Sequence, residues 1–128
     1  MASQGNTNIK YEPGDFCHVE LPVKDKARAK TFYGEVFGWK FQDVSEMDYT
    51  LFTTPGGVVG GGFFTPSKEM PDKVINYITV KSIEETAERV TKFGGKTLGP
   101  KMEIKGQGMM MHLADSEGNM IALWQQLK

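Results

Sequence analysis

Three features are scarce in this sequence of 128 residues: cysteine, net charge and long apolar runs. Its one cysteine, Cys17, excludes an internal disulfide and favours a reducing compartment. Fifteen basic and sixteen acidic residues leave a net charge of −1, so nothing attracts the chain to nucleic acid or to an anionic membrane. No apolar run approaches the roughly 20 residues of a membrane-spanning helix, and residues 1–15 lack the apolar centre of a signal peptide. We therefore expect a cytoplasmic protein with no nucleic-acid or membrane partner.

Glycine and proline, in contrast, are plentiful. The 15 glycines and 6 prolines predict many turns and several short strands. The length suits one domain with a substantial core. Residues 1–14 are mostly polar and predict a mobile tail, which leaves 15–128 as a single domain.

The stretch 16–38 predicts a strand followed by a capped helix. The odd strand positions are all apolar: Cys17, Val19, Leu21 and Val23. Period-two alternation turns this face toward a core and puts His18 and Glu20 on the opposite face. Asp25 is a suitable N-cap, and Gly38 suits the left-handed residue that ends a helix. One apolar stripe lies between them: Ala29, Phe32, Tyr33 and Val36.

The outline of this stretch returns 57 positions later, so the chain reads as an internal duplication. Val23 and Gly38 match Val80 and Gly95, and Ser82 begins a capping box. Further strands are predicted at 39–44, 48–53, 58–64, 74–80, 96–103, 109–114 and 120–126, and a second helix at 83–93. The prediction is an α+β fold of two βαβββ modules, at about 15–66 and 73–127, that form a curved, open barrel-like sheet. A cleft between the modules would suit a small organic molecule.

The segment Phe32-Tyr33-Gly34-Glu35-Val36-Phe37-Gly38-Trp39 resembles the FYxxxFGW signature of the vicinal oxygen chelate superfamily, which includes glyoxalase, bleomycin-resistance and extradiol dioxygenase proteins. The turn at 115–118 and the closing strand resemble the second module of the same superfamily. The match runs from about Phe16 to Gln125, and it is nearest to the small glyoxalase-like proteins. The resemblance implies a homodimer.

Metal-using members of that superfamily place one ligand on the first and last strand of each module. The repeat puts those positions at His18, Gly61, Ile75 and Ala122. Since only His18 can bind a metal, the usual four-ligand site is not inherited and no cofactor is expected. A rearranged divalent-metal site from His18, Glu20 and His112 is the alternative.

Alternation also predicts which side chains line the cavity. From the first module it selects Phe16, His18, Glu20, Pro22, Tyr49, Leu51, Val59, Gly61 and Phe63; from the second it selects Ile75, Tyr77, Thr79, Met110, His112, Ala114, Met120, Ala122 and Trp124. We expect His18 and Glu20 to be the catalytic pair, since a carboxylate beside an imidazole raises its pKa and holds its tautomer. A satisfied polar pair at the sheet edge is the simpler interpretation. Ligand-binding roles are predicted for Tyr77, Met110, His112, Trp124 and Phe63.

Three functions remain open from the sequence. The first is a glyoxalase-like binding protein or enzyme that acts on a small organic ligand without the usual metal site. The second is a metal-dependent lyase, isomerase or dioxygenase with His18 as one ligand. The third is a binding protein that sequesters an antibiotic or another toxic compound.

Cys17 is expected to be a buried structural thiol, because no base accompanies it on its strand face.

Overall fold

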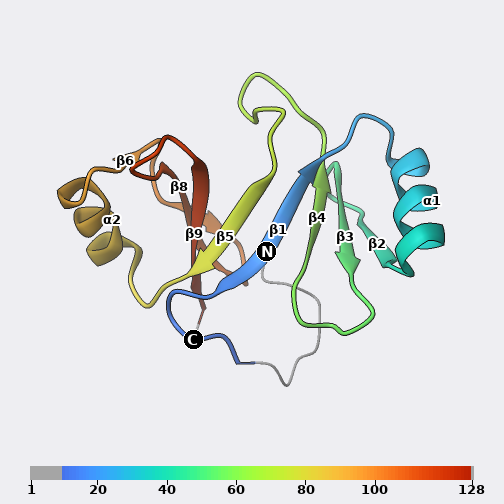
Figure 1. Ribbon diagram of the computed structural model, residues 1–128, viewed down its shortest axis with the longest axis horizontal. Helices are drawn as coiled ribbons and strands as arrows, with labels where there is room; N and C mark the ends of the chain where they lie inside the picture. Colours follow the sequence, from blue (N-terminus) through green and yellow to red (C-terminus); the bar gives the residue numbers. More distant parts are fainter. Residues whose placement is uncertain (1–9, 128) are drawn as a thin grey trace. The chain divides into compact units, whose positions relative to one another are not determined.

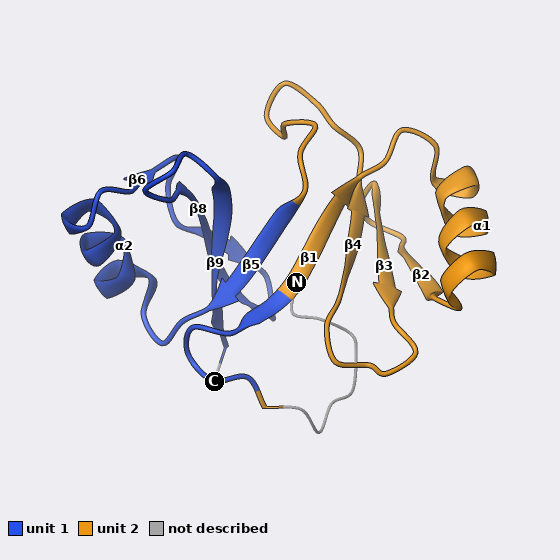
Figure 2. Ribbon diagram, in the orientation of Figure 1, with its two compact units in different colours: residues 1–2, 11–17, 75–128 blue, residues 3–10, 18–74 orange. Residues whose placement is uncertain are grey.

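The computed structural model describes residues 10–127, and most of the predicted tail, 1–14, lies outside them. The chain forms two compact units (Figure 2), with residues 18–74 in unit 2 and residues 11–17 and 75–127 in unit 1. Strand β1, Phe16–Pro22, begins in unit 1 and continues into unit 2. The order of elements confirms the predicted α+β fold of two βαβββ modules (Figure 1).

Unit 2 is a four-stranded sheet with one helix. Strand β1 is followed by helix α1, Lys26–Phe37, and by strands β2, Lys40–Val44, β3, Tyr49–Thr53, and β4, Gly60–Phe64. Strand β4 lies parallel to β1 and antiparallel to β3, which pairs with β2. Helix α1 begins at the Asp25 cap, whose carboxylate accepts the Arg28 N–H at 3.0 Å. It ends at Gly38, whose φ of 76° is the left-handed conformation that glycine adopts without strain.

The core of unit 2 lies between α1 and one face of its sheet. Val23, Phe52 and Phe63 are buried there, and Val19 and Leu21 of β1 pack against them. Helix α1 contributes Ala29 and Tyr33, while Phe32 and Val36 of the predicted stripe are 53% and 57% exposed. The prediction of four core-facing residues on this helix is therefore wrong for two of them. Trp39, just after the helix, packs against this core instead. Its ring stacks between those of Tyr33 and Phe52, at centroid distances of 4.5 and 4.3 Å.

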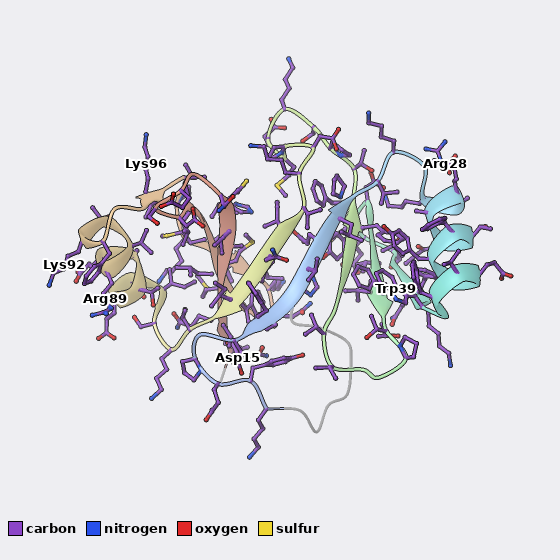
Figure 3. The ribbon with its side chains drawn as sticks, in the orientation of Figure 1. Asp15, Arg28, Trp39, Arg89, Lys92 and Lys96 are labelled. Atoms are coloured by element: carbon purple, nitrogen blue, oxygen red, sulfur yellow. The ribbon has the colours of Figure 1, made fainter. Side chains whose placement is uncertain are left out.

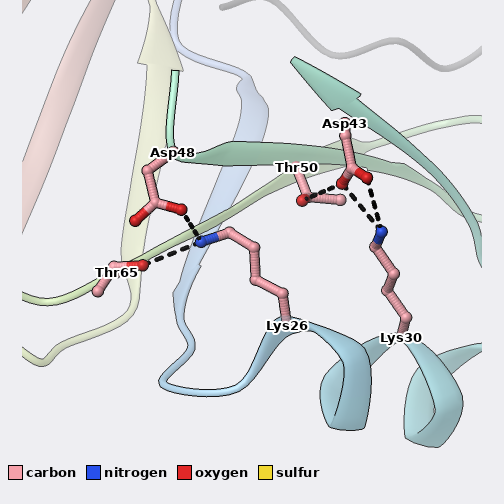
Figure 4. Close-up of polar contacts among 6 residues, drawn as sticks. All are labelled: Lys26, Lys30, Asp43, Asp48, Thr50 and Thr65. Carbon is pink, nitrogen blue, oxygen red and sulfur yellow. Dashed lines mark hydrogen bonds and ion pairs between the residues drawn. The ribbon is translucent and has the colours of Figure 1, made fainter. Parts of the chain in front are cut away.

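Polar contacts add to this apolar packing between α1 and the sheet, because the α1 residues themselves are only partly buried or exposed. Lys26 donates to Asp48 at 2.5 Å and to Thr65 at 2.9 Å (Figure 4). Lys30 donates to Asp43 at 2.9 Å, and that carboxylate also accepts the Thr50 hydroxyl at 2.6 Å. These hydrogen bonds lower the pKa of both carboxyl groups.

Unit 1 repeats the layout with one interruption. It contains β5, Ile75–Thr79, helix α2, Ile83–Lys92, β8, Gly108–Ala114, and β9, Met120–Gln126; β9 pairs with both β5 and β8. The strand predicted at 96–103 is two short strands, β6, Lys96–Thr97, and β7, Met102–Ile104, which both pair with β8. Gly99 and Pro100 separate them, because proline cannot donate to a strand ladder. The core lies under α2 and contains Ile83, Leu113 and Leu123.

Candidate functional site

His18 and Glu20 lie on the face of β1 that points away from the α1 core. Their neighbours Val19 and Leu21 pack with that core, so alternation places the two polar side chains on the opposite face, as predicted. His18 is fully buried and Glu20 is only 3% exposed. Burying two ionisable side chains costs free energy unless they are hydrogen-bonded.

Tyr49 supplies those hydrogen bonds. This residue begins β3 and is also buried. Its hydroxyl donates to Glu20 Oε2 at 2.8 Å and lies 2.7 Å from His18 Nε2. The phenol has one proton, so we assign the Nε2–H tautomer to His18, with the imidazole donating to the phenol oxygen. The three side chains form a chain of hydrogen bonds, here called the His18–Tyr49–Glu20 relay.

The sequence placed Tyr49 on this face but gave it no role. The sequence predicts that the Glu20 carboxylate, beside the imidazole, raises the His18 pKa. That expectation is wrong, because the phenol stands between them and burial lowers the His18 pKa to about 3. His18 is therefore neutral at pH 7.

Gly62 makes room for the relay. Strand β4 pairs Gly62 with Glu20, and a Cβ atom at Gly62 would lie 2.0 Å from Tyr49 Cζ and from its hydroxyl oxygen. Gly61 points the other way, where a Cβ would lie 1.8 Å from the Val19 carbonyl oxygen. The predicted cavity positions Gly61 and Phe63 are therefore one residue out of phase, and Phe63 lies in the α1 core. Gly62, not Gly61, occupies the relay face, and it also lacks a metal ligand.

Replacing Gly62 by alanine should displace Tyr49 and break the relay. We expect Gly62→Ala to lower the free energy of unfolding by about 1–3 kcal/mol, the usual range for overpacking a buried site. Urea unfolding followed by circular dichroism measures the change. Gly99→Ala is the matched control, since a Cβ there meets nothing within 4 Å. Equal stability of the two variants would show that the Tyr49 ring does not lie against Gly62.

Unit 1 has its own face opposite the helix core, and four predicted ligand-binding residues lie on it. Met109 and Met111 of β8 pack under α2, which turns Met110 and His112 to the other face. Tyr77 and Trp124 are each 1% exposed, and the Tyr77 hydroxyl donates to Met110 Sδ at 3.7 Å. Their ligand-binding roles, and that of His112, stay predictions.

His112 is half-buried, and burial lowers its pKa. Its Nε2 atom is buried and has no hydrogen-bond partner among residues 10–127. Cys17 is 1% exposed, and burial raises the pKa of its thiol to about 11, so the thiol is protonated at pH 7. This protonation fits a structural thiol and not a nucleophile.

Two further features bear on the predicted chemistry. Across residues 10–127, no three His, Cys, Asp or Glu side chains are grouped so that they could hold a metal ion. The relay itself supplies one imidazole and one carboxylate.

Within residues 10–127, neither helix has the length and apolarity needed to cross a membrane.

Comparison with known proteins adds a family context. The family described as "Bleomycin resistance protein-like N-terminal" matches residues 15–55. A "Glyoxylase-like domain-containing protein" of Didymella fabae is 32% identical over 118 residues, covering 86% of this chain and 92% of the relative. The "Putative glyoxylase CFP32" of Mycobacterium bovis is 28% identical over 123 residues; they cover 91% of this chain but 47% of the relative, so the chain spans about half of that protein.

A solved structure shares the fold. It is a glyoxalase/bleomycin resistance protein/dioxygenase superfamily member from Vibrio splendidus, with a TM-score of 0.64 and 15% identity. The alignment covers 85% of this chain and 96% of the other. At this identity the match shows the fold alone.

Proposed function

This chain belongs to the glyoxalase-like vicinal oxygen chelate superfamily, and from that premise we propose that it binds a small organic compound against the strand face that carries His18, Tyr49 and Glu20. The observation that carries the proposal is the buried relay itself. It occupies the side of the sheet opposite the apolar core. Burial there makes polar groups costly, so a site that keeps three of them is a candidate for ligand recognition.

The relay suggests what chemistry these residues would perform. His18 is neutral and donates from Nε2, so it does not serve as the proton acceptor at that atom. Glu20 accepts the Tyr49 proton in a hydrogen bond and is the group that would accept a proton from a bound acidic C–H or O–H. Tyr49 would position the carboxylate through its one hydroxyl proton. The proposed activity is general acid–base chemistry on a small oxygen-bearing compound, with a catalytic role for Glu20 and positioning roles for Tyr49 and His18.

Pure binding is the second candidate. The family match to bleomycin-resistance proteins and the aromatic, methionine-rich face of unit 1 favour it. On this account Tyr77, Met110 and Trp124 contact a planar part of the ligand. The homodimer and the cytoplasmic location expected from the sequence remain proposals.

Titration with bleomycin and with methylglyoxal–glutathione hemithioacetal separates the two candidates. We expect one compound to bind the wild type in calorimetry and to raise its melting temperature. Glu20→Gln keeps the size of the side chain, and it should abolish any turnover while binding falls by tenfold or less. Binding without turnover in the wild type, weakened by Trp124→Phe, would select the binding protein. Binding and turnover unchanged in Glu20→Gln and Tyr49→Phe would contradict a ligand site at the relay.

A further inference from the structure

A hollow lies in unit 2, beside the first half of α1 and lined by none of the relay residues. Its volume is about 480 Å³, within the range of small-molecule sites. The end of β1 contributes Leu21 and Val23, and helix α1 contributes Ala29, Phe32 and Tyr33. Together these side chains give the hollow an apolar lining. Phe32 is the residue that the helix pattern predicted to be in the core, yet it is 53% exposed at this hollow.

The lining of the hollow also includes charged residues. These are Lys24, Asp25, Arg28 and Asp72. The Asp25 carboxylate is occupied as the helix cap, at 3.0 Å from the Arg28 N–H. Lys24 and Asp72 lie 3.8 Å apart and are largely exposed, so they mainly offset each other's charge.

The remaining cation of the lining is the Arg28 guanidinium. Lys26 and Lys30 of the same helix are paired with Asp48 and Asp43. Within residues 10–127 no such ion pair is found for Arg28, which lies at the first turn of α1 (Figure 3). Phe32 follows Arg28 by four residues, so both side chains lie on one side of the helix. An unpaired planar cation thus stands beside an apolar hollow.

We propose that this hollow, here called the α1 pocket, binds a compact apolar group that carries a carboxylate or a phosphate. The apolar part would pack on Leu21, Ala29 and Phe32, and Arg28 would bind the anion. A guanidinium presents two parallel N–H donors that match both anions, which a lysine ammonium does not. The inference does not depend on the proposed function, because no residue of the relay lines this pocket.

NMR titration of the full chain with 3-phenylpropionate tests the α1 pocket. We expect the backbone amide and the Arg28 side-chain signals to shift around Val23, Arg28 and Phe32, with weaker binding for the neutral 3-phenylpropionamide. Arg28→Gln should weaken the acid about tenfold and change the affinity for the amide less than twofold. Arg28→Lys should lie between them. Phenyl phosphate, titrated in parallel, distinguishes a phosphate from a carboxylate ligand by its relative affinity.

Arg89→Gln is the matched control, since Arg89 also precedes a phenylalanine by four residues and lies 5.4 Å from the Phe93 ring, but on α2 and outside the pocket (Figure 3). It should leave the affinity for 3-phenylpropionate unchanged. Equal affinity for acid and amide, shifts confined to another surface, or no effect of Arg28→Gln would each overturn the proposal. None of these outcomes depends on whether the relay binds a ligand.

Discussion

Tyr49→Phe is expected to lower the free energy of unfolding by about 3 kcal/mol. The substitution removes one oxygen atom and keeps the ring. That oxygen donates to Glu20 at 2.8 Å and lies 2.7 Å from His18 Nε2, and all three side chains are buried. Two buried polar groups therefore lose the partner that Tyr49 provides. Leaving a buried polar group without its partner costs about 1–3 kcal/mol, and more when the group is charged.

Urea unfolding at pH 7 measures this effect, and Tyr33→Phe is its control. Tyr33 is a half-buried phenol that packs on Trp39, and its hydroxyl makes no side-chain hydrogen bond within residues 10–127. Its variant should stay within about 0.5 kcal/mol of the wild type. If Tyr49→Phe changes the free energy of unfolding equally little, the phenol does not link His18 and Glu20 in a buried hydrogen-bond network.

The second large effect is a loss of stability on mild acidification. Burial lowers the His18 pKa from 6.5 to about 3 in the folded chain. Between these two values the unfolded chain binds a proton that the folded chain does not, so stability falls as the pH falls. The full contribution is present above pH 6.5 and is lost progressively toward pH 3. Each pH unit in this window costs up to about 1.4 kcal/mol, so unfolding at pH 4.5 should require about 3 kcal/mol less than at pH 7.5.

Unfolding free energies measured at half-unit steps from pH 7.5 to pH 4.5 test this expectation. The pKa values of Asp43 and Asp48 are lowered from the ordinary aspartate value, so both side chains stay ionised in the folded chain over this range. Their titration therefore contributes little to the measured change in stability. His18→Gln should flatten the profile, whatever its stability at pH 7. His112→Gln should leave most of the slope, since His112 is only half-buried. If the slope disappears in His112→Gln and persists in His18→Gln, then His112 causes the pH dependence and the expectation for His18 is wrong.

The fold could be predicted because the sequence shows regular strand alternation and recognisable helix-capping residues. Odd positions of β1 are apolar, and the structure packs Val19 and Leu21 under the helix. The same alternation correctly divided β8, with Met109 and Met111 under α2 and Met110 on the other face. Asp25 and Gly38 marked the ends of α1 because each has a chemical reason to stand there.

The phase of β4 could not be predicted from its residues. Three successive glycines carry no side chain, so Gly60, Gly61 and Gly62 give no alternation to read. Phe63 and Phe64, which follow them, are both apolar and both buried, on opposite faces of the sheet. The contacts that fix the phase join β4 to other strands: Gly62 lies against the Tyr49 ring, and Gly61 faces the Val19 carbonyl oxygen.

The sequence predicted two members of the relay and missed the third, because the third comes from another strand. His18 and Glu20 share a face by their spacing alone, but their bridge comes from residue 49, about 30 positions away. A tyrosine opposite a glycine-rich strand is the signal that could have suggested it, since the missing side chains leave room for a ring. The exposed Phe32 was mispredicted because a helical stripe does not show how wide the sheet-facing side is.

Nitrogen NMR of the histidine rings at pH 5 tests the buried relay most directly. If the relay is present, the His18 ring is neutral, with its proton on Nε2 and in a hydrogen bond to Tyr49, and this signal moves in Tyr49→Phe. A His18 ring that is protonated at pH 5, with a midpoint near 6.5, would mean that this side chain is solvated, and the site proposed around it would then be wrong.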